Sequence, residues 1–269
     1  MKISRRAAGA LLVVFAALAA IGFSGCSRKR RAERDGRNRR EHEEAEKSSR
    51  APRLAIIIDD LGNDPSEARA VLALPFPITV SVLPHREYST QTADKAWRSG
   101  DQVILHLPMQ PIADGAKSEK IELCVGMRES QVRSIVAGML ANVPHAVGVN
   151  NHEGSRATAD PQLMAELMPV LRARGLFFID SRTTAATVAY ATAERVGVRA
   201  ASRKVFLDDV ATREAVLAQL DLAAHDAMRD GSAIAIGHPH PGTIAALAEG
   251  VPKFERRGIH LVFASKLVH

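Results

Sequence analysis

The sequence predicts an α/β protein built on a parallel sheet, and two observations lead to this class. Short apolar runs recur from Ala51 to the C-terminus, and stretches with helical periodicity separate them. Near-continuous apolarity over a few residues is typical of strands that are buried on both faces. Because about eight strand–helix units follow one another, we expect the sheet to form a barrel. An open doubly wound sheet is the second possibility, although no glycine-rich phosphate loop follows the first run.

The predicted strands consist mainly of Ile, Val, Leu, Ala and Phe. In chain order they are residues 53–60, 78–85, 102–109, 146–152, 175–182, 204–209, 232–239 and 260–266. Amphipathic stretches between them predict helices at residues 65–74, 131–142, 161–174 and 213–228. The third helix has a clear start, since Asp160 can cap it and Pro161 suits its first turn.

An export signal precedes the folded part. Lys2, Arg5 and Arg6 come before an apolar run at residues 7–23, which is the pattern of a signal peptide. The run ends in FSGC, which resembles a bacterial lipobox whose cysteine, Cys26, becomes the lipidated N-terminus. An uncleaved membrane anchor and ordinary secretion are the alternatives, because about 17 residues is the short limit for a spanning helix. We therefore expect an exported domain tethered in the bacterial envelope by a lipid or an anchor, facing the periplasm or the exterior.

Residues 27–50 contain almost no apolar side chain, so we expect a charged, disordered tether between the signal (1–26) and a domain at 51–269. The chain's basicity also lies in this leader. Residues 1–50 have 13 Lys and Arg against 6 Asp and Glu, whereas the remainder has 23 against 24. The folded domain is therefore not expected to bind nucleic acid. Cys124 is the one cysteine besides Cys26, so we expect no intrachain disulfide and no thiolate metal cage.

Residues that carry chemistry gather at the C-terminal ends of the predicted strands. In a parallel barrel these ends meet on one face, where the active sites of such enzymes lie. Any one of these residues alone could be a helix cap or a loop residue, but the whole set predicts a site at the barrel mouth. The set comprises Asp59, Asp60, His85, His106, His152, Asp180, Asp208, Asp209 and His238.

A pool of Asp and His without cysteine suits a divalent metal ion of hard or borderline character, such as zinc. Motifs of other chemistries are missing, because the sequence contains no G-x-S-x-G, no Walker loop and no H-E-x-x-H. The composition of the mouth therefore favours a metal-assisted reaction.

Six segments between residues 55 and 243 share a pattern, and they read AIIIDDLG, LPFPITVSVLP, VILHLPMQP, AVGVNNHEGS, GLFFIDSRTT and IAIGHPHPGT. Together they resemble the divergent polysaccharide deacetylases, relatives of the NodB-type carbohydrate esterases. The resemblance implies a distorted (β/α) barrel of about seven parallel strands. It also implies metal-assisted hydrolysis of an N- or O-acetyl group on a sugar, with zinc as the expected ion.

The resemblance implies roles for individual residues. Asp60 corresponds to the metal-binding aspartate, and Asp59 to the general base that deprotonates the attacking water. His238 corresponds to the histidine that protonates the leaving group. Asp180 is expected to orient an imidazole or bind the substrate, and Arg182 to pair with Asp59 or bind the substrate. Further substrate contacts are expected from Asn151, Ser181 and His240.

The second motif departs from the family pattern. His106 corresponds to the first metal histidine, but Gln110 stands where ordinary members have the second. Pro108 and Pro111 also oppose a regular helical turn at this place. We therefore expect His152 to supply the third metal ligand from the next strand.

The expected function is a metal-dependent hydrolase that acts on an acetylated envelope or extracellular polysaccharide. Two alternatives stay open. The altered second motif, and a lone Trp97 in a helical stretch where the family has a motif tryptophan, fit an inactive barrel that serves as a glycan- or protein-binding module. The second alternative is another metal-dependent barrel hydrolase that acts on amides or phosphates. Since only 4% of the residues are aromatic, a short or unusual substrate is favoured.

Overall fold

The structure is a computed structural model, and it describes residues 51–112 and 120–269. The predictions for the signal and the tether concern residues 1–50 and lie outside the described residues. None of the helices in the described part is long and apolar enough to cross a membrane.

The described residues form one parallel sheet of nine strands, which confirms the α/β class. The strand order is β6-β5-β4-β3-β2-β1-β8-β7, and β9 pairs with the first half of β1. All eight predicted strands occur. The unpredicted one is β6, whose sequence AAS is too short and too small in its side chains to stand out. The strands are β1 (Arg53–Leu61), β2 (Thr79–Val82), β3 (Gln102–Met109), β4 (Gly148–Glu153), β5 (Phe177–Asp180), β6 (Ala200–Ser202), β7 (Val205–Phe206), β8 (Ser232–Gly237) and β9 (His260–Leu261).

The sheet curves into a distorted barrel whose edge strands are β6 and β7, and it stays open along one seam, where β6 faces the start of β8. Only Arg203 and Lys204 connect β6 to β7 in the chain. Parallel neighbours need a crossover of about a dozen residues or more, so β6 and β7 cannot pair with each other. Instead β7 pairs with β8, and Lys204 N donates a hydrogen bond to Ile234 O at 2.9 Å. The distorted barrel that the resemblance implied is therefore confirmed.

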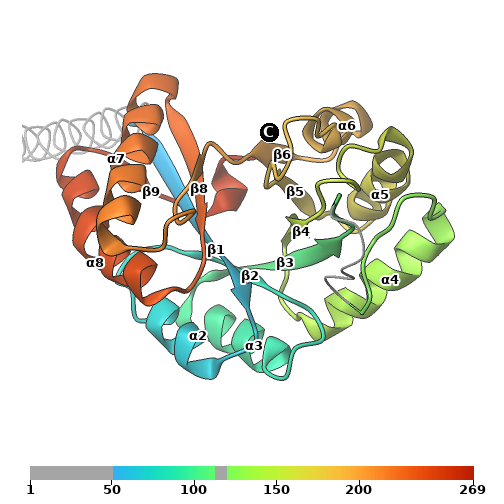
Figure 1. Cartoon of the computed structure of the whole chain (residues 1–269), viewed down its shortest axis with the longest axis horizontal. Coiled ribbons are helices and arrows are strands. Elements are labelled where there is room, and N and C mark those ends of the chain that lie inside the picture. The colour runs from blue at the N-terminus through green and yellow to red at the C-terminus, as the bar shows by residue number, and fades with distance from the viewer. Residues whose placement is uncertain (1–50, 113–119) are drawn as a thin grey trace, which may run out of the picture. The chain divides into compact units, whose positions relative to one another are not determined.

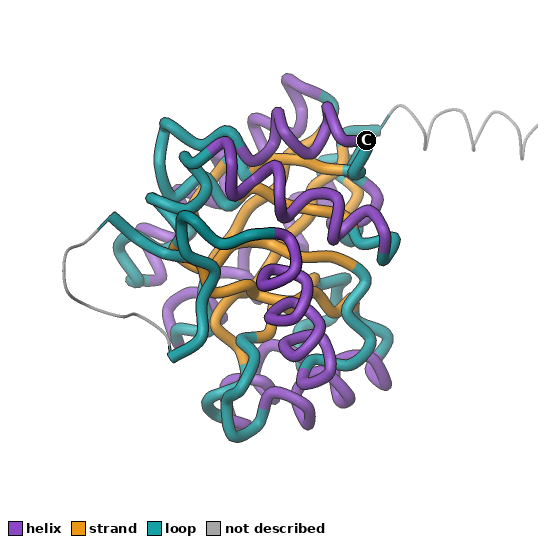
Figure 2. The backbone as a smooth tube through the Cα atoms, turned by 90° about the vertical axis from the view of Figure 1, so that its right-hand side faces the viewer, coloured by secondary structure: helices purple, strands orange, loops and turns teal. Residues whose placement is uncertain are grey.

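The helices lie along the outer side of the sheet, with α7 and α8 at one end of it and α4 to α6 at the other (Figure 1). All four predicted helices occur, and Asp160 caps α5 by accepting a hydrogen bond from Leu163 N at 2.6 Å. Figure 2 shows the strands enclosed by these helices. They are α2 (Pro65–Leu72), α3 (Ser89–Ser99), α4 (Glu129–Asn142), α5 (Pro161–Ala173), α6 (Ala189–Val196), α7 (Arg213–Asp230), α8 (Pro241–Arg256) and the 3₁₀ helix η1 (Ala264–Lys266).

Two apolar layers hold the fold together and fix which side chains face inward. The larger layer lies between the sheet and the helices, and the smaller one fills the barrel. The inner layer includes Ile57, Ile104, Ile179 and Ile236. Because successive strand residues point to opposite faces, the residue two positions after each of these also faces inward. This spacing of two residues places Asp59, His106, Ser181 and His238 next to the inner apolar layer, at the C-terminal end of the barrel, which we call the mouth.

Candidate metal centre and active site

Three predicted ligands converge at the mouth. Asp60 Oδ1 lies 3.2 Å from His106 Nε2 and 3.0 Å from His152 Nδ1, and these two nitrogens are 3.1 Å apart. Donor atoms bind zinc at about 2.0–2.1 Å, which places two ligands of a tetrahedral ion about 3.3 Å apart. Asp60 Oδ1 is also buried, and within the described part of the chain it has no hydrogen bond of good geometry. Three converging donor atoms with this spacing fit a divalent metal ion.

Backbone strain helps to aim the first ligand. Asp60 has a φ of 60°, and two further residues of the cavity wall, Glu153 and Arg182, each have a φ of 50°. Residues other than glycine rarely adopt this left-handed conformation, and such strain is often found at functional sites. Since Asp59 already faces inward, regular strand geometry would turn Asp60 outward. The left-handed turn lets both carboxylates reach the mouth.

The pKa values at the centre reflect opposite charges held close together. Burial alone would raise the pKa of Asp60, but the imidazoles of His106 and His152 lower it well below its usual range. Burial alone would lower the pKa of His106, but the charges of Asp59 and Asp60 raise it. A metal ion that binds here would displace the imidazole protons and take their place beside the ionised carboxylate.

Asn150 orients the centre, although the sequence analysis did not identify it. Its Nδ2 donates to Asp59 Oδ1 at 2.8 Å, and because an ionised carboxylate only accepts, this bond fixes the orientation of the amide. Asn150 Oδ1 then lies 2.9 Å from His106 Nδ1, so this ring nitrogen must be the donor. The other nitrogen, Nε2, keeps its lone pair for a metal ion. One buried amide thus fixes the orientation of the general-base candidate, Asp59, and of a metal-ligand candidate, His106.

Replacing Asn150 by Ala is expected to weaken metal binding by about 10- to 100-fold, because partners of metal-bound histidines have effects of this size. The free energy of unfolding should also fall by about 1–3 kcal/mol, because Asp59 loses a buried hydrogen bond. Metal titration and urea unfolding measure the two effects. Asn151→Ala is the matched control, since Asn151 bonds to Glu153 O and Ser181 N but not to a histidine. Equal metal affinity in the two variants would refute the orienting role.

His238 and Asp208 form a second functional pair. Asp208 Oδ1 lies 3.0 Å from His238 Nδ1, and Asp208 Oδ2 accepts from His238 N at 2.6 Å and from Thr243 Oγ1 at 2.8 Å. Burial lowers the pKa of His238, but the bond to Asp208 and the charges of Asp59 and Asp60 outweigh it and raise the pKa to about 9. His238 Nε2 points to the metal centre, 3.8 Å from Asp60 Oδ2. His238 is therefore protonated at neutral pH and aimed at the mouth.

Asp180 does not have the predicted role. Since Ile179 and Ser181 face inward, Asp180 faces the helices, where it is fully buried. It accepts hydrogen bonds from Arg182 N at 2.8 Å and Thr187 Oγ1 at 2.9 Å, and it thereby holds the loop before α6. The prediction that Asp180 orients an imidazole is corrected, because Asp208 does this for His238.

The predicted pairing of Arg182 with Asp59 is also corrected. Within the described residues no ion pair joins the two, and Asn150 holds Asp59 instead. Arg182 is exposed and lines the mouth, where Arg203 lies beside it. Arg203 donates from Nε to Ser181 O at 2.6 Å and from a terminal guanidinium nitrogen to Arg182 O at 3.0 Å.

Four other candidates fall into two groups. Asn151 and Ser181 line the mouth as predicted. The side-chain amide of Asn151 is hydrogen-bonded to the backbone, since its Oδ1 accepts from Ser181 N at 2.8 Å. His240 is exposed at the start of α8, and His85 is exposed on the loop after β2, and neither is among the residues that line the mouth.

Gln110 explains why the second motif differs. Its Oε1 accepts from Val125 N at 3.1 Å, and its carbonyl oxygen accepts from Arg156 N and Ala157 N. This position therefore braces the loops around β3 and β4 and forms no helical turn that could present a ligand. The third donor at the centre comes from β4 as His152.

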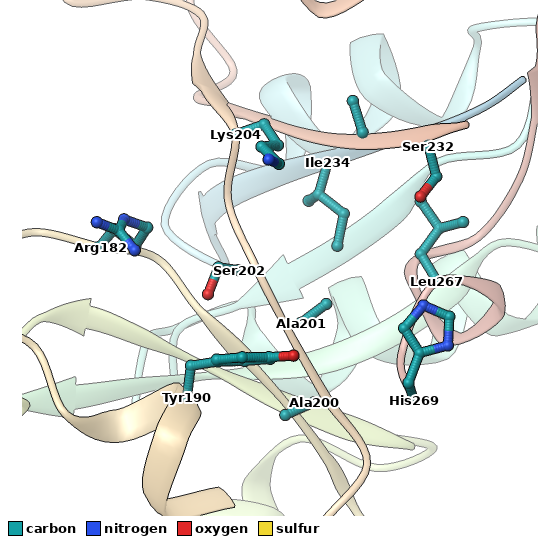
Figure 3. A pocket seen from close by; sticks show the side chains of 11 residues that line it. Arg182, Tyr190, Ala200, Ala201, Ser202, Lys204, Ser232, Ile234, Leu267 and His269 are labelled. Atoms are coloured by element: carbon teal, nitrogen blue, oxygen red, sulfur yellow. The ribbon is translucent and has the colours of Figure 1, made fainter. Parts of the chain in front are cut away.

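The metal centre and His238 share one cavity of about 530 Å³. A second cavity of about 340 Å³ opens at the seam and has Tyr190, Ile234 and Leu267 in its wall (Figure 3). Arg182 belongs to both walls, but the second cavity contains none of the metal-ligand candidates. The chemistry is therefore concentrated in the first, which is lined by Asp59, Asp60, His106, Asn151, His152, Glu153, Ser181, Arg182, Thr183, Arg203, Phe206, Asp209, Ile236 and His238.

Known proteins share both the sequence and the fold. An uncharacterized protein of Haemophilus influenzae is 44% identical over 199 residues, which is 74% of this chain and 71% of the relative. The crystal structure of the uncharacterized protein ATU2773 from Agrobacterium tumefaciens matches with a TM-score of 0.78 and 25% identity, covering 81% of this chain and 90% of that one.

More distant solved structures show the fold alone. The catalytic domain of a peptidoglycan N-acetylglucosamine deacetylase from Eubacterium rectale has a TM-score of 0.50 and 14% identity, covering 79% of this chain and 88% of that one. BA3943 of Bacillus anthracis, a CE4 family pseudoenzyme, has a TM-score of 0.51 and 12% identity, covering 81% and 65%. The fold therefore occurs in a deacetylase and in a pseudoenzyme.

The family model described as divergent polysaccharide deacetylase matches residues 56–268. This range includes the whole mouth and nearly all of the sheet. The chain belongs to the divergent polysaccharide deacetylase family.

Proposed function

We propose that this protein is a metal-dependent hydrolase that removes acetyl groups from a polysaccharide of the bacterial envelope. One observation carries the proposal: three donor atoms spaced 3.0–3.2 Å apart, with Asp59 and His238 beside them. A binding module has no need for a carboxylate and a protonated imidazole on either side of a metal site. The export signal in the leader supports a location outside the cytoplasm.

Asp60, His106 and His152 would hold the metal ion, for which zinc is our proposal because of the Asp and His donors. A divalent cation there would supply Lewis acidity, which makes a water molecule easier to deprotonate and polarises the acetyl carbonyl. Three protein ligands leave room for water and substrate, as catalytic metal sites do.

Asp59 is suited to accept the proton of the attacking water. Its Oδ1 is occupied by Asn150 Nδ2, whereas its Oδ2 faces the centre, 3.7 Å from His106 Nε2. The carboxylate is buried and fixed, so it does not have to reorganise when the proton arrives. Asp59 is in contact with the ligand shell without being one of the three ligands.

His238 is suited to donate a proton to the leaving group. Water attacks the acetyl carbonyl, Asp59 takes a proton from the water, and the bond from the carbonyl carbon to the sugar nitrogen or oxygen breaks. His238 Nε2 protonates that departing atom, while Asp208 holds Nδ1 and stabilises the imidazolium. Acetate and the free amine or hydroxyl are the products.

The cavity is suited to a short stretch of glycan. Its volume of about 530 Å³ lies within the range of small-molecule sites. Phe206 supplies one aromatic surface, and Arg182 and Arg203 supply donors for hydroxyl or acidic groups. The wall thus offers few stacking surfaces, which agrees with a substrate that is held mainly by polar contacts.

The metal content of the purified chain tests this proposal first. We expect about one tightly bound zinc ion per chain after reloading with one equivalent of zinc, and loss of that ion in His152→Ala, because one of three donors is removed. Elemental analysis measures the content, and an acetate-release assay on acetylated glycans then measures turnover. His225→Ala is the control, since His225 is exposed on α7.

The outcomes separate the candidate functions. A chain without metal, even after reloading, would refute the hydrolase mechanism. Metal binding without turnover on any acetylated glycan would favour the binding-module alternative, and turnover on a different amide or phosphate would favour another hydrolase.

A further inference from the structure

Asp208, His238 and His240 form a second group of potential metal ligands, which we call the outer cluster. Each residue offers one donor atom, and these atoms lie within 4.8 Å of one another. Asp208 Oδ1 and His238 Nδ1 are already 3.0 Å apart, close to the spacing of about 3.3 Å that two zinc ligands adopt. The rings of His238 and His240 have centroids 5.9 Å apart.

The third member of the cluster is free to complete a site. His240 is exposed, and although it occupies the N-cap position of α8, its side chain makes no capping hydrogen bond. A change of its rotamer can therefore bring its ring nitrogen to an ion without a cost to the helix. Burial raises the pKa of Glu67 on α2, and the charge of His240 acts on this carboxyl in the opposite direction, so a further acidic group lies near.

The chemistry of His238 connects this cluster with the reaction. As the proton donor, His238 needs Asp208 at its Nδ1. A metal ion that is bound by Asp208 and His238 Nδ1 displaces the Nδ1 proton to solvent and takes the carboxylate away from the imidazole. The ion and the Nδ1 proton compete for the same nitrogen, so a filled outer cluster leaves a neutral imidazole whose remaining Nε2–H is a far weaker acid than the imidazolium.

We propose that the outer cluster binds a second divalent ion, zinc by its ligand chemistry, and that this ion inhibits the enzyme. The site is weaker than the first because one of its three donors, His240, is exposed and has to be held in place by the ion itself. The binding of the second ion is independent of the reaction, whereas its inhibitory effect rests on the proposed function. Rising zinc therefore first activates the protein and then switches it off.

Zinc titration of the full, metal-free chain tests the binding. Calorimetry, with elemental analysis after dialysis against excess zinc, should show two ions per chain, the second bound at least 10-fold more weakly. His240→Ala should bind one ion. His240→Gln should also bind one ion, although glutamine fills more of the volume of the histidine than alanine does. His225→Ala should keep both, and His152→Ala should lose the first ion and keep the second. A wild-type chain that saturates at one ion, or a His240→Ala variant that still binds two, overturns the proposal.

Turnover tests the inhibition. In the wild type, acetate release should fall over the zinc range that fills the second site, and His240→Ala should need at least 10-fold more zinc for the same loss. Equal sensitivity of the two proteins overturns the inhibitory role. If neither protein turns over an acetylated glycan, the proposed function fails, and the titration still decides whether the outer cluster binds metal.

Discussion

Replacing Asp59 by Asn is expected to lower kcat by about 10³-fold while the protein still binds one metal ion. The asparagine has nearly the same shape, and its Oδ1 can still accept the hydrogen bond from Asn150 Nδ2. The three donor atoms of Asp60, His106 and His152 are unchanged. What is lost is the negative charge that accepts the proton of the attacking water. The loss should therefore appear in kcat far more than in metal affinity.

The measurement combines acetate release with metal content for the same preparation. Asp64→Asn is the matched control, because Asp64 lies a few residues further along the chain and caps α2 by accepting from Ser66 N at 2.6 Å. Asparagine caps helices about as well as aspartate, so this control should keep its activity and its metal. Full activity of Asp59→Asn would show that another group is the base. Loss of metal in that variant would show that Asp59 belongs to the ligand shell.

The strands and the mouth were predictable because burial on both faces leaves apolar runs that end where the chemistry begins. The run before Asp59 and the one before His238 end in this way, and the structure brings both residues to one cavity. Even His152, which replaces a ligand at a different place in the chain, lies at ligand distance from Asp60.

It was less predictable which face of the sheet an individual strand residue points to. Apolarity on both faces removes the alternation that would tell inside from outside, so Phe177, Phe178 and Ile179 look alike in the sequence. A shift by one residue then decides whether Asp180 or Ser181 faces the mouth. The error on Asp180 arises from this ambiguity, not from its position at the strand end.

Partners from different strands could not be found without the strand order. Asn150 lies opposite His106 in the parallel register of β3 and β4. Phe206 lies opposite Ile236 in β7 and β8, and the same register continued by two residues places Asp208 beside His238. Both polar partners therefore follow from the pairing of strands that are far apart in the sequence or out of sequence order. Gly237 adds to this contact, because a Cβ atom there would lie 3.1 Å from Asp208 Oδ2.

Asp208→Asn should narrow the pH range of activity on the alkaline side. In the wild type the pKa of His238 is about 9, so the acid form persists through neutral pH and is lost as the pH rises through that value. Without the carboxylate the hydrogen bond remains possible but its charge is gone, and the pKa of His238 moves toward the ordinary value of about 6.5. The alkaline limb of kcat should therefore shift to lower pH by about 1–2 units. At pH 8 this shift leaves about a half to a tenth of the acid form, so we expect a loss of about 2- to 10-fold, and at pH 6 a much smaller one.

A pH profile of kcat between about pH 5.5 and 9.5 measures this shift, because that range includes both the wild-type pKa of His238 and the ordinary pKa of histidine. The metal content is checked at each end of the range. Asp209→Asn removes the same charge from the neighbouring residue, which is exposed and lines the same cavity. Because Asp208, and not Asp209, bonds to His238, the control should keep its alkaline limb even if its KM changes. If both variants shift the alkaline limb of the kcat profile equally, the summed negative charge of the cavity, and not the bond to Asp208, sets the pKa of His238. If neither shifts it, the alkaline limb belongs to another group, and His238 is not the proton donor.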